Sequence, residues 1–202
     1  MSGVVVIRTG TANIASMMAA LRRLDVAPLL TADPDVIRAA DRVVLPGVGA
    51  FAAALEHLHE DGADAAIAER ATAGRPLLAV CLGLQMLARE SEESPGVTGL
   101  GVLPVDVTRF PEDVQVPQLG WNKVTPTSGS RFIEEGYAYY ANSYRLPELP
   151  AGWEGAWSEH GDRFVAAAER GDVLACQFHP ELSGAWGHEL LGRWLRATGA
   201  SC

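Results

Sequence analysis

The sequence predicts an α/β fold with three layers, in which an open, mostly parallel sheet carries helices on both faces and is extended by antiparallel strands. Over roughly the first 90 residues, short and nearly continuous apolar runs alternate with segments of helical periodicity. Such runs are typical of parallel strands that are buried on both faces. After residue 94, prolines and glycines become frequent and the apolar runs become shorter and more alternating, which is typical of antiparallel or mixed β structure.

The first part of the chain is expected to form three buried strands with helices between them. The strands are predicted at residues 4–7, 42–45 and 77–80, where Val, Ile, Leu and Ala dominate. Helices are predicted at residues 14–24 and 65–73 from the helical spacing of apolar side chains. A further alanine-rich helix begins at Ala50 and Phe51, after a Pro-Gly-Val-Gly stretch breaks the second strand.

The second part of the chain is expected to add β structure and one closing helix. Predicted strands cover residues 101–107, 121–124, 137–140, 164–169 and 173–178. Residues 184–195 place Leu190, Leu191, Trp194 and Leu195 on one side of an amphipathic helix. With no repeat, low-complexity tract or linker in the sequence, we expect a single domain over residues 1–202.

Composition excludes several classes of function. The formal net charge of −9 argues against a nucleic-acid or anionic-membrane partner. The three cysteines, Cys81, Cys176 and Cys202, form no CxxC pair, so we expect no disulfide scaffold, no metal site and no cofactor. The N-terminus lacks the pattern of a signal peptide, and no apolar run reaches the roughly 20 residues that span a bilayer. A cytoplasmic protein is therefore expected.

Cys81 is the most informative residue, because it lies where a buried apolar strand breaks into a helix. Gly83 allows a tight turn at that break. The turn exposes the sulfur, and the unpaired N–H groups of a helix N-terminus favour a thiolate. We therefore predict that Cys81 is a nucleophile.

A nucleophilic cysteine needs a base, and His179 and Glu181 are the candidates. Pro180 favours an extended backbone at the residue before it. In an extended segment, side chains two residues apart point to the same side. The Glu181 carboxylate is therefore expected to orient the His179 imidazole that serves Cys81, which is the minimum set for covalent acyl transfer.

The residues after the second strand are candidates for an oxyanion site. Gly47, Val48 and Gly49 lie at the carboxyl edge of the predicted sheet, where parallel sheets hold their ligands. Backbone N–H groups there can approach a developing oxyanion, and the N–H of Leu82 is the natural second donor. The bare Pro-Gly-Val-Gly pattern is also compatible with a simple turn.

Each of these residues also has an ordinary structural interpretation. A lone cysteine in an apolar stretch is usually inert core, and a lone histidine is more often a surface or hydrogen-bonded core residue. The combination of a strand-to-helix break at Cys81 with a His-Pro-Glu stretch favours the catalytic interpretation.

These motifs resemble those of the class I (triad) glutamine amidotransferases, namely VCLGLQ at 80–85 and QFHPE at 177–181. Further stretches are similar to the glutaminase subunits of imidazole glycerol phosphate synthases: TGTAN at 9–13, LPGVGAF at 45–51, SEESPGV at 91–97, PQLGWN at 117–122 and ANSY at 141–144. The resemblance covers nearly the whole chain and implies the flavodoxin-like fold of class I glutamine amidotransferases.

The resemblance implies a reaction and a partner. Cys81 would attack the carboxamide of glutamine, ammonia would leave with a proton from His179, and the resulting thioester would be hydrolysed to glutamate. Ammonia would pass to a separate (β/α)₈-barrel cyclase subunit in a heterodimer. There it would be built into imidazole glycerol phosphate for histidine biosynthesis, with an aminoimidazole carboxamide ribotide (AICAR) as the co-product.

The resemblance also implies binding residues. Gln85 and Glu93 match positions that contact glutamine, as does the backbone of Asn142, Ser143 and Tyr144, although Gln85 and Glu93 are equally compatible with capping helix ends. The candidates for the partner interface are Asn13, Gln118, Trp121 and Asn142.

The chain departs from the family pattern at Gln118 and Asn142, where the family commonly has histidine. An amide can donate and accept hydrogen bonds but cannot titrate near neutral pH. Neither position belongs to the triad, so we expect an effect on coupling to the partner or on ammonia passage. The alternatives are a glutaminase subunit of another ammonia-using synthase, a stand-alone γ-glutamyl cysteine hydrolase and a non-catalytic subunit.

Overall fold

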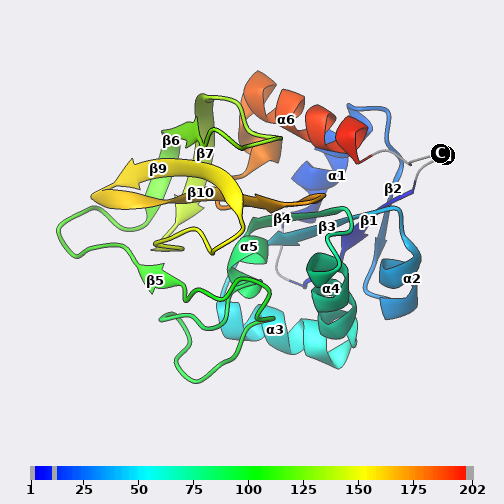
Figure 1. The fold of residues 1–202 in the computed structure, drawn as a ribbon. Coiled ribbons are helices and arrows are strands. Elements are labelled where there is room, and N and C mark those ends of the chain that lie inside the picture. The colour runs from blue at the N-terminus through cyan, green and yellow to red at the C-terminus, as the bar shows by residue number, and fades with distance from the viewer. Residues whose placement is uncertain (1–2, 11–12, 199–202) are drawn as a thin grey trace.

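A computed structural model describes residues 3–10 and 13–198, and it has an α/β architecture with three layers (Figure 1). Among these residues, one sheet contains nine strands in the order β2-β1-β3-β4-β11-β10-β9-β6-β7, and β5 pairs with β8. The elements are β1 Val4–Ile7, α1 Ile14–Arg22, β2 Pro28–Thr31, α2 Pro34–Ala39, β3 Arg42–Gly47, α3 Phe51–Glu60, α4 Ala63–Thr72, β4 Leu77–Cys81, α5 Leu82–Met86, β5 Thr108–Arg109, β6 Gln118–Pro126, β7 Gly136–Asn142, β8 Tyr144–Arg145, β9 Glu154–His160, β10 Asp162–Arg170, β11 Val173–Cys176, η1 Pro180–Leu182 and α6 Gly184–Ala197.

The sheet changes from parallel to antiparallel pairing at β11. Strands β2, β1, β3, β4 and β11 run parallel to one another, whereas β10, β9, β6 and β7 pair in antiparallel fashion. The second group is the added β structure that the sequence predicts, and β11 joins the two groups. The predicted fold class, an open mostly parallel sheet with added antiparallel strands, is confirmed.

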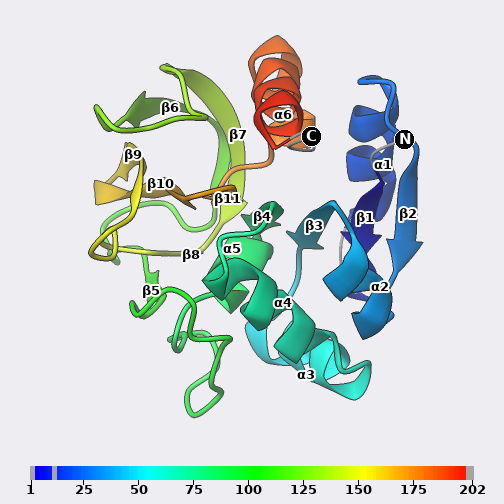
Figure 2. The ribbon, with the colours of Figure 1, turned by 45° about the vertical axis from the view of Figure 1, so that its right-hand side comes forward.

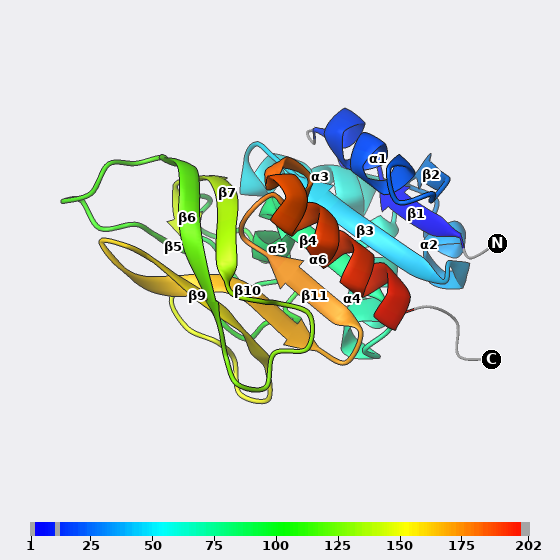
Figure 3. The same cartoon turned by 90° about the horizontal axis from the view of Figure 1, so that it is seen from above.

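Two hydrophobic cores cover the two faces of the parallel strands. Alternate residues of each strand point to opposite faces, so Val5 and Ile7 join the core beneath α2, α3, α4 and α5. Val4 and Val6 join the core beneath α1 and α6. The helices lie on opposite sides of the sheet in Figures 2 and 3. This explains why β1 and β4 are apolar at every position.

Among the described elements of four or more residues, three were not predicted from the sequence. Strand β2 lies at the sheet edge and exposes Leu29 and Leu30, so it lacks the alternation of a half-buried strand. Helix α2 has only six residues, although Asp33 caps it and Pro34 begins it. Strand β9, at 154–160, is a third element that the sequence analysis did not predict.

The prediction of a strand at residues 101–107 is wrong. This segment forms a loop whose backbone pairs with the C-cap residue of α5 and the residue after it: Leu103 N–H donates to Leu87 O at 2.8 Å, and Gly101 N–H donates to Ala88 O at 3.1 Å. The carbonyls left free at a helix C-terminus need such donors. The apolar side chains of this loop pack into the core beside the helices, which accounts for their strand-like pattern.

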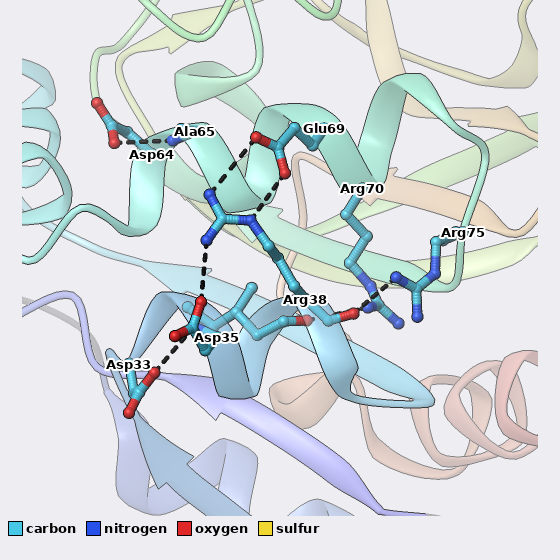
Figure 4. Close-up of polar contacts among 9 residues, drawn as sticks. Asp33, Asp35, Arg38, Asp64, Ala65, Glu69, Arg70 and Arg75 are labelled. Carbon is cyan, nitrogen blue, oxygen red and sulfur yellow. Dashed lines mark hydrogen bonds and ion pairs between the residues drawn. The ribbon is translucent and has the colours of Figure 1, made fainter.

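Buried and exposed arginines hold α2 against α4. Arg38 lies between Asp35 and Glu69 in Figure 4, and its Nε donates to Glu69 Oε2 at 2.8 Å. The buried Arg70 guanidinium donates to the carbonyls of Ile37, Ala40 and Asp41. These bonds satisfy the carbonyls at the end of α2 and the turn before β3. Across the described ranges, every helix is too short or too polar to cross a membrane.

The first turn of α5 packs directly on the backbone of β3. A Cβ added to Gly83 would lie 2.2 Å from the carbonyl oxygen of Leu45, and one added to Gly47 would lie 2.8 Å from the Gly83 nitrogen. Only glycine permits this approach, which places the start of α5 over the end of β3.

We expect Gly83→Ala to lower the free energy of unfolding by about 1–3 kcal/mol, as overpacking typically does. The added methyl group must push α5 away from β3. Chemical denaturation measures the change, and Gly3→Ala is the matched control because no atom lies within 4 Å of its added Cβ. Equal stability of the two variants would contradict the close approach.

Candidate active site

The predicted strand-to-helix break at Cys81 is present. β4 ends at Cys81, and α5 begins at Leu82. Cys81 has a φ of 54°, a left-handed conformation that is strained for a residue with a side chain. The residue is only 6% exposed, so the sulfur is less accessible than the sequence analysis expects, although Cys81 lines a cavity. Strain of this kind persists only where the surroundings hold the backbone, here β3 and β11 on either side of β4.

His179 and Glu181 form an ion pair behind the cysteine. His179 Nδ1 lies 2.9 Å from Glu181 Oε1, and each side chain is 4% exposed. The predicted pairing is therefore present, but it is reached differently from the predicted extended segment. His179 itself is extended, whereas Glu181 lies in the short 3₁₀ helix η1, whose turn brings the carboxylate back toward the imidazole.

The pKa of His179 reflects three influences. Burial alone would lower this pKa, but hydrogen bonds to Cys81 and Glu181, together with their negative charges, raise it to about 10. Below that pH the imidazolium form predominates. The pair is thus arranged as an imidazolium held between a carboxylate and a sulfur, with a proton ready for a leaving group.

Ser183 fixes the backbone around His179, and the sequence analysis missed it. Its Oγ donates to His179 O at 2.6 Å and accepts the Tyr139 N–H at 3.0 Å. His179 N–H also donates to Tyr139 O at 2.9 Å. β7 is thereby tied to the His-Pro-Glu stretch, and no sequence pattern pointed to this link.

The predicted oxyanion residues lie beside Cys81. Gly47 pairs in register with Cys81 across β3 and β4, and Val48 and Gly49 follow at the wall of the cavity. Leu82 is the first residue of α5, where backbone N–H groups have no acceptor within the helix. Gly49 has a φ of 104°, which favours glycine at this bend.

These groups surround a cavity of about 280 Å³. Its lining contains all five predicted substrate-binding residues and most of the catalytic and oxyanion candidates: Val48, Gly49, Cys81, Leu82, Gln85, Glu93, Pro117, Leu119, Ala141, Asn142, Ser143, Tyr144 and His179. Gly47 and Glu181 lie behind this wall. Pro117, Leu119 and Ala141 are lining residues that the sequence analysis did not name.

Of the two roles considered for Glu93 from the sequence, the structure shows the helix cap. Glu93 lines the cavity, and its Oε2 accepts the N–H of Phe51, the first residue of α3, at 2.8 Å. One carboxylate oxygen therefore caps α3 and ties the 91–97 loop to the start of that helix. The other carboxylate oxygen is not used by that bond.

The four candidates for a partner interface differ in exposure. Asn13 is exposed and caps α1 through Ser16 N–H, and Trp121 is 58% exposed on β6. Gln118 and Asn142 are buried and face each other in register across β6 and β7. The two positions that depart from the family pattern are therefore neighbours beneath the surface, next to the cavity.

The described part of the chain contains no group of three or more His, Cys, Asp or Glu side chains placed to hold a metal ion. Cys176 is buried in the core beneath α1 and α6. Cys202 lies outside the described residues, as do Thr11 and Ala12 of the TGTAN stretch.

Comparison with known proteins gives one consistent family. The model of the family "Glutamine amidotransferase class-I" matches residues 6–197. The imidazole glycerol phosphate synthase subunit HisH of Escherichia coli K12 is 40% identical over 197 residues, covering 95% of this chain and 98% of that protein. HisH of Carboxydothermus hydrogenoformans is 38% identical over 183 residues, covering 89% and 92%. A crystal structure of a glutamine amidotransferase superposes with a TM-score of 0.79 at 23% identity, covering 98% of this chain and all of that one.

We expect Cys81→Ala to lower the pKa of His179 from its value of about 10, because the variant loses the hydrogen bond and the charge of the sulfur. NMR titration of the His179 ring measures the pKa. His59, which pairs with Asp64 and does not line the cavity, serves as the control and should titrate alike in both proteins. An unchanged pKa of His179 in Cys81→Ala would contradict a direct interaction between Cys81 and His179.

Proposed function

This chain belongs to the class-I glutamine amidotransferase family and, within it, to the HisH subunits of imidazole glycerol phosphate synthase, and we propose that it hydrolyses glutamine and supplies the ammonia to a cyclase subunit. The observation that carries this proposal is that Cys81 and His179 line one cavity, with Glu181 paired to His179 behind its wall. We propose a single glutaminase domain over residues 1–202, located in the cytoplasm.

The proposed first step is attack of the Cys81 sulfur on the side-chain carbonyl carbon of glutamine. A C–S bond forms, and the carbonyl oxygen becomes an oxyanion that backbone N–H groups of the 47–49 segment and Leu82 stabilise. The C–N bond then breaks, and the amide nitrogen takes the proton of His179 and leaves as ammonia. A γ-glutamyl thioester remains on Cys81.

The second half of the reaction reverses the role of the histidine. Neutral His179 accepts a proton from water as the water oxygen attacks the thioester carbonyl. The C–S bond breaks, which releases glutamate and restores the thiolate beside the imidazolium. Glu181 holds the ring through Nδ1 in both steps, so Nε2 is the nitrogen that is left to transfer protons.

An exposed apolar surface on β6 and β7 supports the proposal that a cyclase subunit binds to this chain. Leu119, Trp121 and Tyr137, on β6 and β7, are 67%, 58% and 59% exposed. Leu119 also lines the active-site cavity. Exposed aromatic side chains of this kind are enriched at protein interfaces. A partner bound on this surface would lie next to the point at which ammonia leaves.

We expect Cys81→Ala to lower glutamate production from glutamine by about 10³-fold or more, because the nucleophile is lost. A coupled glutamate assay on the complex with the cyclase subunit measures the rate, and binding of the cyclase should be unchanged. Substantial residual activity in a folded variant would contradict the assignment of the nucleophile.

The partner is tested by measuring glutamate production with the protein alone, with a cyclase subunit, and with the cyclase plus its ribonucleotide substrate. The expected result is weak activity alone and a large rise in the complete mixture. A free-standing hydrolase would be fully active alone. A subunit of another synthase would not be activated by the cyclase, and a non-catalytic subunit would be inactive in all three mixtures.

We expect Gln118→His, which restores the residue common in the family, to change the ratio between the activated and the unactivated rates more than the unactivated rate itself. The side chain lies outside the cavity lining but next to Asn142. Assays with and without the cyclase ligand measure the ratio. If the ratio were the same as in the wild type, Gln118 would have no role in the coupling between the subunits.

A further inference from the structure

Gln177 is a buried amide side chain that the proposed reaction does not use. It follows β11 directly and is 0% exposed. Its chain neighbours Cys176 and Phe178 lie in the hydrophobic core. Burying an amide costs free energy unless its donors and acceptor find partners, so the partners of this side chain indicate why it is there.

Both ends of the Gln177 side chain contact residues of the active site. Its Nε2 donates to Cys81 Sγ at 3.8 Å, and its Oε1 accepts from Gln85 Nε2 at 3.1 Å. Cys176 pairs with Val80 in the parallel register of β11 and β4, so the next residues along, Gln177 and Cys81, lie side by side.

The contact with Gln85 fixes which end of that amide faces the cavity. Gln85 Nε2 has two N–H groups, and these donate to Tyr144 O at 3.0 Å and to Gln177 Oε1 at 3.1 Å. Both donors are therefore used inside the protein. The carbonyl oxygen of Gln85 remains as its free group, and Gln85 lines the cavity.

We propose that Gln177 acts on the glutaminase reaction in two ways: its N–H stabilises the Cys81 thiolate, and its carbonyl holds Gln85 so that Gln85 accepts a hydrogen bond from an N–H group of the substrate. This inference rests on the proposed function. The N–H contact with the reacting sulfur makes Gln177 a catalytic residue toward Cys81, and it is a positioning residue toward Gln85.

Two variants separate these roles. Gln177→Met keeps the length of the side chain but has neither the N–H nor the carbonyl. Gln177→Glu keeps an acceptor for Gln85, but the carboxylate gives no N–H to the sulfur and adds a negative charge beside it. Cys81→Ala and wild type are measured in parallel, and circular dichroism with thermal unfolding reports on folding.

The first readout is alkylation of Cys81 by iodoacetamide across a pH series, followed by mass spectrometry on the Cys81 peptide, because only the thiolate reacts. Loss of the N–H that favours the thiolate should slow the reaction by about tenfold or more at the pH values where thiol and thiolate coexist. We expect this slowing in both variants. A profile that overlays the wild type in either folded variant would overturn the contact with the thiolate.

The second readout is kcat and KM for glutamine in the complete synthase. We expect kcat to fall in both variants, whereas KM rises more in Gln177→Met than in Gln177→Glu. In a Gln85→Met background, Gln177→Met should no longer raise KM, because the residue through which it acts has gone. An equal rise in both backgrounds would overturn the positioning role.

The alkylation assay needs neither glutamine nor a partner, so it separates this inference from the proposed function. If wild type and Cys81→Ala produced glutamate equally slowly in the complete synthase, the proposed function would fail. The alkylation profiles would still decide whether Gln177 interacts with the sulfur.

Discussion

The parallel register of β4 between β3 and β11 is the constraint on which the site depends. It aligns Gly47 with Cys81 on one side and Val80 with Cys176 on the other. The 47–49 segment, the cysteine and the stretch from Gln177 to His179 therefore leave the sheet at the same edge. A slip of one residue in this register would turn each side chain to the other face, and the three segments would no longer meet.

Close backbone packing makes this edge rigid. Gly83 and Gly47 allow α5 to rest on the end of β3. The left-handed backbone of Cys81 is the strained point that this packing maintains. The antiparallel strands contribute from the other side, where Tyr139 on β7 anchors the backbone of His179.

The cavity wall is a network of amides and ionisable groups, and each member positions the next. Glu181 orients His179, and Gln177 links Cys81 to Gln85. Asn142 Nδ2 donates to Tyr144 O, which also accepts from Gln85. Gln118 pairs in register with Asn142. Of the two amides that stand where the family commonly has histidine, Asn142 therefore ends the hydrogen-bonded path that begins at the sulfur, and Gln118 lies beside it across the strand pair.

The sequence by itself determined the fold class and the strand-to-helix break at Cys81, because apolar periodicity and glycine placement are local properties. It also indicated the pairing of His179 with Glu181, because only Pro180 separates them. Tertiary structure decided what depends on partners distant in the chain: the edge strand β2, the 101–107 loop that pairs with α5, the Ser183 link to β7 and the Gln177 contact with the sulfur. A hydrogen bond between residues about a hundred positions apart leaves no periodic signal in the sequence. It is identified only in the folded structure, where adjacent strands of the sheet bring the two residues together.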